Sequence, residues 1–374
     1  MNRFGYYFRR ATEKVVRLTR VNTLIYRFAR GTPLLFSREQ VDAARAFLEE
    51  CSPNPKTSCI CQNKIDPQVD LHIIIPAYNV ERYIKECLDS VVFCATEKYT
   101  YLITVINDGS TDKTVEFLRE YEVIPQIEII TQENKGFSGA RNTGLSHIKG
   151  RYVLFLDSDD RLDWRGVERL LEVADASGAE IVVGAHTTID VNGNRISFHK
   201  KRAGEISKKE LGGTPWAKVF KAELFSDLCF PENYWYEDSI FAQVLYPRIS
   251  RAGSISENTY YYRVNPSGIT ARGQRKIKSI DSYWITEQLF ENRKELGLNI
   301  TQEYYEYILR MVYLTFHRIR FQAYEVKKSV FLLFVDFIEK NCTGWSTQDK
   351  RLKEIEKVVK TRNLEKCIAF AKWM

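Results

Sequence analysis

The chain has 374 residues, 44% of them hydrophobic, which is enough for a packed core in one large domain with additions or in two domains, and which excludes a largely disordered or collagen-like protein. No apolar run exceeds residues 330–335, far short of the ~20 residues of a membrane span, and the N-terminus lacks the apolar segment of a secretory signal. The net charge of +7 divides into +7 in residues 1–30, −7 in residues 31–270 and +7 in residues 271–374, and this acidic body argues against a protein that wraps nucleic acid.

Residues 1–30 have the pattern of a basic amphipathic helix. Apolar side chains recur every three or four residues, and arginines and lysines lie between them. Such a helix could lie on an anionic membrane surface, where each basic residue contributes about 1 kcal/mol. It could equally pack its apolar stripe against the body of the protein. Both interpretations stay open.

Residues 51–67 contain three prolines and little periodicity, which predicts a linker at the end of a basic helical extension, residues 1–67. Cys51, Cys59 and Cys61 lie in this segment, but their spacing matches no standard pair of zinc ligands and no histidine is near. Because the chain shows no export signal, we expect its eight cysteines to be reduced thiols in an intracellular protein.

From residue 69 onward, short apolar runs alternate with amphipathic helical stretches. The pattern predicts strands at 71–75, 101–106, 127–130, 152–156 and 181–183, with helices at 81–93, 111–121, 138–148 and 164–176. This alternation predicts an α/β fold, with a mostly parallel central sheet and helices on both faces. Ligands of such sheets bind beyond the carboxyl ends of the strands, so the residues that follow each strand are the candidates for a site.

Residues 271–374 show no clear strands. Their periodicity predicts three or four helices, including 279–292, 303–321 and 328–341. We therefore expect a catalytic α/β domain at residues 68–270, followed by a basic helical region at residues 271–374.

An acidic cluster follows the predicted strand 152–156. Asp157 and Asp159 are two residues apart, so in an extended segment both side chains point the same way. Two carboxylates so placed repel each other unless a cation lies between them, and oxygen ligands favour Mn²⁺ or Mg²⁺, with substrate phosphates completing the shell. The alternative is a solvated acidic turn that caps the next helix. The position directly after an apolar strand favours the metal.

Three further candidates lie near other strand ends. Tyr78, which follows Pro76, could stack on a nucleobase, a contact that contributes ~1–3 kcal/mol, and Asp108 could accept a hydrogen bond from the base. Arg141, near the start of a helix, could bind an anionic diphosphate. Each residue also fits an ordinary turn or helix start, but their order along the chain adds weight to the functional interpretation.

Glu237 and Asp238 precede a helical stretch at residues 240–245. The backbone dipole at the start of a helix stabilises a charged acid. A general base must begin ionised, so this position suits one, and a capping role is compatible with it.

Together these motifs resemble the family 2 glycosyltransferases, which have the GT-A fold. The resemblance runs from about residue 71 to residue 238, nearly half of the chain. The matching segments keep the order of the family and are residues 76–79, 107–112, 134–142, 157–160, 215–218 and 237–238, with a weaker similarity at 261–263 and 267–270.

The resemblance implies a metal-dependent transfer of a sugar, with inversion, from a nucleotide-diphosphate donor (a UDP-sugar is the simplest expectation). In the family, the residues matching Pro76, Tyr78 and Asp108 hold the nucleotide. The residue matching Asp157 lies by the ribose and the metal, and the residue matching Asp159 ligates the metal, Mn²⁺ or Mg²⁺.

The same resemblance assigns the acceptor side. The residue matching Asp238 is the base, Glu237 contacts the acceptor, and Trp216 shapes the sugar and acceptor pocket. Bacterial members commonly extend surface polysaccharides, so we expect a glycan or lipid-linked acceptor. We expect a cytoplasmic protein, which could contact the inner face of the membrane through its basic ends.

Two alternatives remain. A sugar-phosphate nucleotidylyltransferase would carry a glycine-rich segment with an arginine near the first strand, where this chain has residues 76–79. A non-catalytic scaffold, tethered to the membrane in a polysaccharide complex, would not need the acidic residues that this chain keeps.

Overall fold

The computed structural model describes residues 32–92, 98–265 and 275–373, which fall into two compact units. The sheet unit comprises Thr57–Asn233 and Glu237–Asn265, and the helical unit comprises Met1–Lys56, Tyr234–Tyr236 and Pro266–Met374. The predicted amphipathic helix at residues 1–30 and the weak motif at 267–270 lie outside the described residues.

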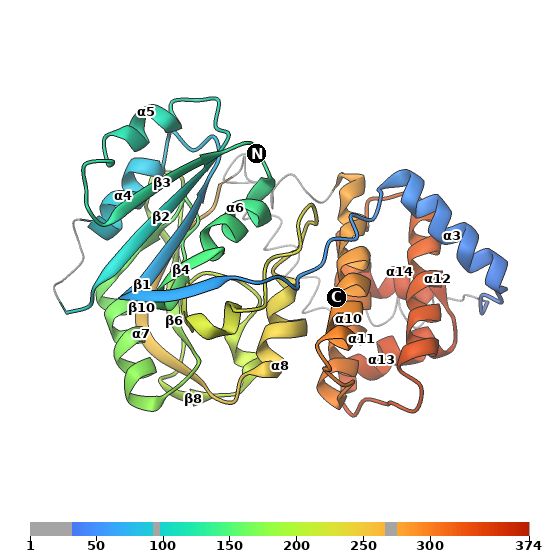
Figure 1. Ribbon diagram of the computed structural model, residues 1–374. Coiled ribbons are helices and arrows are strands. Elements are labelled where there is room, and N and C mark those ends of the chain that lie inside the picture. The colour runs from blue at the N-terminus through green and yellow to red at the C-terminus, as the bar shows by residue number, and fades with distance from the viewer. Residues whose placement is uncertain (1–31, 93–97, 266–274, 374) are drawn as a thin grey trace. The chain divides into compact units, whose positions relative to one another are not determined.

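The sheet unit is built on a ten-stranded sheet with the order β3-β2-β1-β4-β9-β6-β10-β5, in which β7 also pairs with β6 and β8 with β10 (Figure 1). The strands are β1 (Lys64–Ala77), β2 (Tyr101–Asp108), β3 (Ile127–Gln132), β4 (His147–Phe155), β5 (Arg161–Leu162), β6 (Ile181–Ile189), β7 (Arg195–His199), β8 (Gly204–Ile206), β9 (Lys218–Lys221) and β10 (Ala252–Arg263).

The long pairings of this sheet are parallel. They join β1 to β2 and β4, β2 to β3, and β6 to β10. The short strand β9 runs antiparallel between β4 and β6, and β5, β7 and β8 add short antiparallel pairings. The predicted α/β class is confirmed.

Helices cover both faces of the sheet. On one face, α4 (Ile84–Val92), α5 (Thr114–Arg119) and α7 (Trp164–Ser177) share a core with alternate β1 residues such as Ile73. On the other face lies α6 (Gly136–Leu145), where a Cβ atom at Gly144 would come within 2.5 Å of Ile74 Cγ2. The close approach of α6 to β1 therefore requires glycine at this position.

Shorter helical segments complete the sheet unit. They are the 3₁₀-helices η1 (Lys208–Leu211) and η2 (Ala222–Phe225), the π-helix η3 (Phe241–Leu245) and the short helix α8 (Tyr246–Arg248).

The predicted boundary between the helix at residues 138–148 and the next strand is wrong. The helix expected at residues 138–148 ends at Leu145, and β4 begins at His147. The reason is a long-range pairing, because Lys64 and Ile65 of β1 lie opposite His147 and Ile148. Helical periodicity in the sequence cannot report this competition from a strand more than eighty residues earlier.

The described part of the helical unit contains no strand. Its elements are α3 (Arg38–Cys51), the 3₁₀-helix η5 (Ile277–Ile280), α10 (Asp281–Glu295), α11 (Gln302–Arg318), α12 (Tyr324–Asn341), α13 (Lys350–Lys360) and α14 (Leu364–Trp373). Five α-helices thus follow residue 275, where the sequence predicted three or four. The apolar run at 330–335 forms the buried centre of α12.

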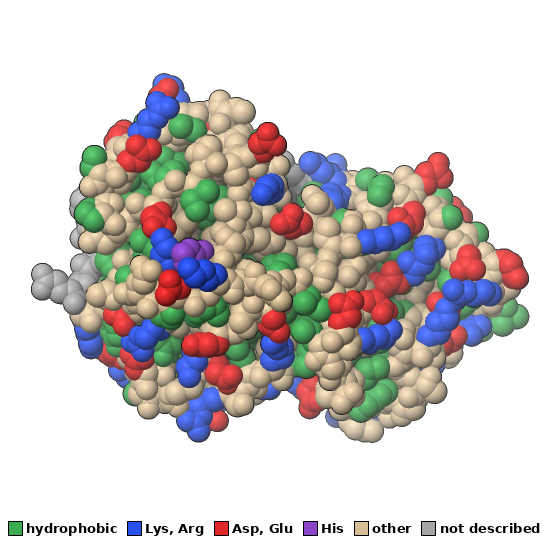
Figure 2. Space-filling model, viewed as in Figure 1, with side chains coloured by type: hydrophobic (Ala, Val, Ile, Leu, Met, Phe, Trp, Pro, Cys, Tyr) green, Lys and Arg blue, Asp and Glu red, His purple; other side chains and the backbone are tan. Residues whose placement is uncertain are grey.

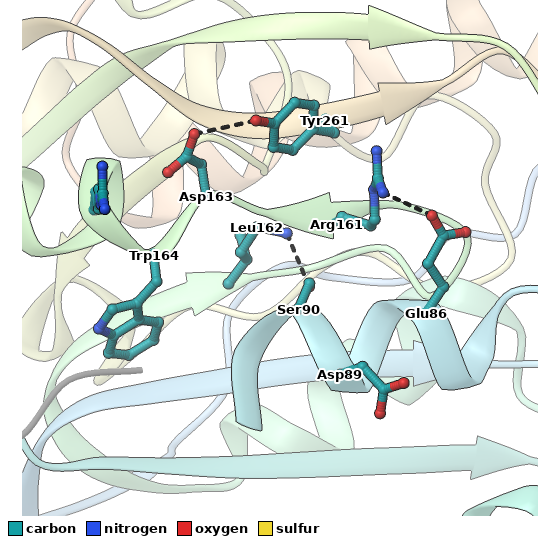
Figure 3. Close-up of a pocket in the computed structure, with 9 residues that line it drawn as sticks. Glu86, Asp89, Ser90, Arg161, Leu162, Asp163, Trp164 and Tyr261 are labelled. Atoms are coloured by element: carbon teal, nitrogen blue, oxygen red, sulfur yellow. Dashed lines mark hydrogen bonds and ion pairs between the residues drawn. The ribbon is translucent and has the colours of Figure 1, made fainter. Parts of the chain in front are cut away.

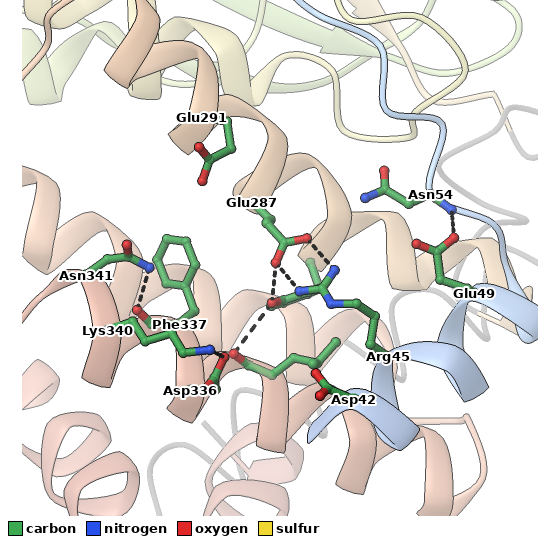
Figure 4. Close-up of polar contacts among 12 residues, drawn as sticks. Asp42, Arg45, Glu49, Asn54, Glu287, Glu291, Asp336, Phe337, Lys340 and Asn341 are labelled. Atoms are coloured by element: carbon green, nitrogen blue, oxygen red, sulfur yellow. Dashed lines mark hydrogen bonds and ion pairs between the residues drawn. The ribbon is translucent and has the colours of Figure 1, made fainter. Parts of the chain in front are cut away.

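A polar network ties α3 to α10 within the helical unit (Figure 4). Arg45 donates hydrogen bonds to Glu287 through both of its terminal nitrogens, and Tyr283 donates its hydroxyl to the same carboxylate at 3.0 Å. The Trp284 indole N–H donates to the carbonyl of Ser52 at 2.9 Å, just beyond the end of α3. Helix α3 is therefore an integral part of this unit.

Charges are mixed on the face drawn in Figure 2, where Lys and Arg side chains are interspersed with Asp and Glu. Among the described helices, none combines the length and the apolar character needed to cross a lipid bilayer.

Candidate active site

The first predicted site residues gather at one edge of the sheet. β2, β1 and β4 are parallel neighbours, so their carboxyl ends lie at the same edge. Pro76 lies near the end of β1 and Tyr78 follows that strand, Asp108 ends β2, and Asp157 comes two residues after β4. The structure therefore brings these four positions together.

The loops after β1 and β2 are joined to each other. Asn79, which adopts a left-handed conformation (φ = 50°), donates its backbone N–H to Ser110 Oγ at 3.1 Å. Its Oδ1 accepts the backbone N–H of Thr111 at 2.8 Å. Tyr78 remains 49% exposed beside this joint, so its ring is accessible to a ligand.

Asp108 is buried and connects two further elements. Its Oδ1 accepts hydrogen bonds from Gln132 Nε2 (2.7 Å), at the end of β3, and from the backbone N–H of Lys135 (2.8 Å), just before α6. The carboxylate therefore organises the edge of the sheet at the entry to α6.

Residues 157–160, the acidic turn, use their three carboxylates differently. Asp160 is buried, and its two oxygens accept hydrogen bonds from the Tyr260 hydroxyl (2.7 Å) and the Arg263 backbone N–H (2.6 Å). Burial raises the pKa of Asp159, and the charge of Asp157 raises it further. Asp157 and Asp159 thus form the repelling pair that the sequence predicted, while Asp160 serves the fold.

Arg141 links the acidic turn to the Glu237–Asp238 pair. Its buried guanidinium donates from Nη2 to Asp157 Oδ1 and from Nη1 to Glu237 Oε1, both at 2.8 Å. Burial by itself would lower the pKa of Arg141, but the two carboxylates raise it above its ordinary value. Two acidic segments that are 80 residues apart in the sequence therefore share one cation.

Glu237 is almost completely buried. Burial raises the pKa of its carboxyl to about 7; Arg141 opposes this shift, and the neighbouring charge of Asp238 adds to it. The predicted helical stretch after this pair is a π-helix, Phe241–Leu245, a form that is found often at functional sites.

Trp216 stands in a stack of aromatic rings. It lies nearly parallel to Tyr260 and Tyr262, with ring centroids 4.9 and 5.3 Å away, and meets the edge of His186 at 4.9 Å. Because the Tyr260 hydroxyl bonds to Asp160, the stack is connected directly to the acidic turn.

Lys218 was not assigned a role from the sequence, although it belongs to the 215–218 motif. It is buried, and its Nζ donates to the carbonyls of Thr214 (2.7 Å) and Trp216 (3.4 Å). Burial lowers the pKa of Lys218 to about 7, and the charge of Asp238 opposes this shift. Lys218 therefore holds the Trp216 loop near the acid pair.

The acidic turn offers carboxylate oxygens to a divalent cation. Among the described residues, no three His, Cys, Asp or Glu side chains are arranged as a complete metal site. The two-carboxylate pair Asp157 and Asp159 nevertheless fits a magnesium-like ion that takes its remaining ligands from substrate phosphates and water.

A separate groove of about 770 Å³ opens beside β5 in the sheet unit (Figure 3). Glu86, from α4, pairs there with Arg161 at 2.8 Å, and Asp163 accepts the Tyr261 hydroxyl at 3.2 Å. None of the predicted site residues lines this groove.

Comparisons with known proteins find sequence similarity over the part of the chain that contains this edge of the sheet. Residues 72–229 match the family model described as Glycosyl transferase family 2. The glycosyltransferase GlyA of Streptococcus pneumoniae is 33% identical over 53% of this chain and 31% of its own length. The poly(ribitol-phosphate) beta-glucosyltransferase of Bacillus spizizenii is 30% identical over 53% of this chain and 33% of its own length.

The fold of this chain is also similar to that of a solved structure. The crystal structure of S. aureus TarS 1–349 in complex with UDP-GlcNAc covers 81% of this chain and 90% of that chain, with a TM-score of 0.54 and 17% identity. At this identity the likeness concerns the fold alone, and it confirms the predicted GT-A class. The match spans about a third of the length of each of the two relatives named above.

Proposed function

From the match of residues 72–229 to the family model described as Glycosyl transferase family 2, we propose that this protein transfers a sugar from a nucleotide-diphosphate donor to an acceptor hydroxyl. The observation that carries the proposal is the position of Arg141, 2.8 Å from both Asp157 and Glu237. This contact unites the residues predicted to bind the donor with those predicted to act on the acceptor.

The donor that we propose is a UDP-sugar. TarS, which shares the fold, binds UDP-GlcNAc. In this chain the exposed ring of Tyr78 offers a stacking surface for the base, and Pro76 and Asp108 lie at the same edge of the sheet. The sugar itself is left open.

The cation that we propose is Mn²⁺ or Mg²⁺, held by Asp159 and Asp157. When bound, it would supply positive charge to the diphosphate that leaves the sugar. The chain's own contribution is a pair of carboxylates. Burial raises the pKa of Asp159 and the charge of Asp157 raises it further, so a cation between the two carboxylates would stabilise their charged forms.

Asp238 is the base that we propose. It takes the proton from the acceptor hydroxyl as the oxygen attacks the anomeric carbon from the face opposite the diphosphate, so the configuration inverts. Glu237, held by Arg141, contacts the acceptor. Trp216, supported by Tyr260 and Tyr262, provides a flat apolar wall for the sugar.

The acceptor that we propose is a hydroxyl of a glycan or lipid-linked polymer in the synthesis of a surface polysaccharide. The Bacillus spizizenii relative is named for transfer to poly(ribitol-phosphate). The basic charge of residues 1–30 and 271–374 is suited to an anionic membrane surface or polymer.

A screen of nucleotide sugars by thermal unfolding tests the proposal. A donor present at 100 times its Kd should add ~2.7 kcal/mol to the free energy of unfolding. We expect stabilisation by one or a few UDP-sugars that depends on Mn²⁺, followed by slow hydrolysis of the same donor. A non-catalytic scaffold would show no hydrolysis, and the absence of stabilisation by every nucleotide sugar would overturn the proposal.

A further inference from the structure

The acidic turn is held from outside by the end of β10 and by α4. The Tyr260 hydroxyl lies 3.1 Å from the backbone N–H of Asp157 and donates to Asp160 at 2.7 Å. Three residues further along β10, at the end of the strand, Arg263 also contacts this turn. The chain therefore fixes the turn through residues that take no part in the proposed chemistry.

Arg263 contacts the acidic turn at the backbone carbonyl of Asp159 and at the buried carboxylate of Asp160. Its Nε donates to the carbonyl of Asp159 at 2.7 Å, and its own backbone N–H donates to Asp160 Oδ1 at 2.6 Å. The side chain is almost fully buried, and its guanidinium lies over the ring of Tyr83, 4.8 Å from the centroid. These contacts hold the guanidinium in one position.

The guanidinium of Arg263 forms its ion pair with an acid outside the turn. Its Nη2 donates to Glu86 Oε2 at 2.6 Å, and Glu86 binds Arg161 through Oε1 at 2.8 Å (Figure 3). In the turn itself the guanidinium contacts the carbonyl of Asp159. Glu86 thus provides a counter-charge for Arg263 outside the acidic turn.

We propose that Arg263 and Glu86 are positioning residues, which set the backbone of the acidic turn so that Asp157 and Asp159 face a divalent cation together. This inference rests on the proposed function, because it concerns the cation that accompanies the nucleotide. Partners of this kind, one step removed from the metal, are worth about 10–100-fold in metal affinity.

Electrostatics alone predicts the opposite result. If Arg263 acted only as a nearby positive charge, its removal would make the surroundings of the carboxylates more negative and would strengthen cation binding. If it positions the turn, Arg263→Gln weakens cation binding in spite of the more favourable charge. The direction of the change therefore separates the two roles.

The experiment is a calorimetric titration of UDP into the full chain, once with Mn²⁺ and once with EDTA. For Arg263→Gln we expect the Mn²⁺-dependent gain in UDP affinity to fall by about tenfold or more, while the affinity in EDTA stays unchanged. Arg263→Lys should not restore the gain, because an ammonium cannot reproduce the planar geometry that reaches Asp159 and Glu86 at once.

A matched control lies in the middle of β4. Arg151 pairs there with Asp70 (2.8 Å) and Asp175 (3.2 Å), so Arg151→Gln removes an arginine ion pair from the strand that leads to the acidic turn. This variant should retain the full Mn²⁺-dependent gain. A second variant, Glu86→Gln, leaves Arg263 in place and unbalances its charge, and should also weaken the gain.

The outcomes separate the two proposals. If the unaltered protein binds UDP no better with Mn²⁺ than with EDTA, the proposed function fails and this inference fails with it. If the unaltered protein shows the gain and Arg263→Gln binds as tightly or more tightly, only the inference is overturned. Should Arg263→Gln not fold, Arg263→Lys takes its place, because it keeps the charge and changes the geometry; an unchanged gain in that variant or in Glu86→Gln overturns the inference.

Discussion

The acidic turn and the Glu237–Asp238 segment both offer carboxylates to Arg141, but the protein holds them differently. The turn follows a buried strand, and hydrogen bonds to Tyr260 and Arg263 fix its backbone and its third acid. Glu237 lies before a π-helix, and its side chain accepts a hydrogen bond from Arg141.

The difference indicates that the proposed cation site needs a rigid backbone, whereas the proposed acceptor side needs an adjusted carboxyl pKa. A cation requires two oxygens at set positions, so a rigid turn suits it. A proton acceptor requires a suitable pKa, which burial and neighbouring charges can adjust, and the raised pKa of Glu237 shows such an adjustment in this segment.

The strongest test of the turn is Asp159→Asn. The change removes one of the two carboxylates and with it the repulsion that favours a cation, so we expect metal-dependent turnover to be lost. Initial rates measured across a Mn²⁺ titration would show this. Asp66→Asn, an exposed acid at the far end of β1, is the control, and a normal Mn²⁺ response in Asp159→Asn would remove that residue from the site.

The corresponding test of the second segment is Asp238→Asn. We expect transfer to slow by about 10²-fold or more, the usual scale for loss of a general base, with the affinity for the donor retained. Steady-state kinetics combined with UDP titration would separate the two quantities. Rates near those of the unaltered protein would exclude Asp238 as the base.

Arg141→Lys tests whether the two segments depend on one shared cation. A lysine keeps the charge but cannot donate in two fixed directions to Asp157 and Glu237, so we expect kcat to fall by roughly tenfold with a smaller change in KM. Thermal unfolding must be recorded beside the kinetics. Equal losses in activity and in folded fraction would show a purely structural role.

Glu237→Gln tests the tuning of the second segment through pH. The folded pKa of about 7 exceeds the ordinary value of 4.5, so the folded state binds this proton more tightly than the unfolded state. The stability linked to Glu237 is therefore present below about pH 4.5 and is lost as the pH rises through 7.

The glutamine of the variant does not titrate, so the stability of the variant relative to the unaltered protein should increase between pH 5 and pH 7.5. Urea unfolding of both proteins at the two pH values measures the effect. A relative stability that does not depend on pH would contradict the burial of an ionisable group at Glu237.

The local pattern of the sequence was enough to predict the class of fold, and it singled out the candidate residues that the structure brings to one edge of the sheet. Strands of a parallel sheet that is covered on both faces are continuous apolar runs, as at 71–75, so both they and the polar residues that end them can be recognised. The helix end at Leu145 and the number of C-terminal helices could not be predicted, because long-range pairing and packing decide them.

Only the tertiary structure decided which charged side chains contact each other. The sharing of Arg141 by Asp157 and Glu237, the inward position of Asp160 and the reach of Arg263 to Asp159 join residues that are from 16 to more than 100 positions apart. Periodicity reports which face a side chain occupies, whereas ion pairs and pKa shifts depend on distances across the folded chain. The candidate site residues can therefore be recognised in the sequence. Which of them form ion pairs, and which are buried, is decided only when the strands bring them to one edge of the sheet.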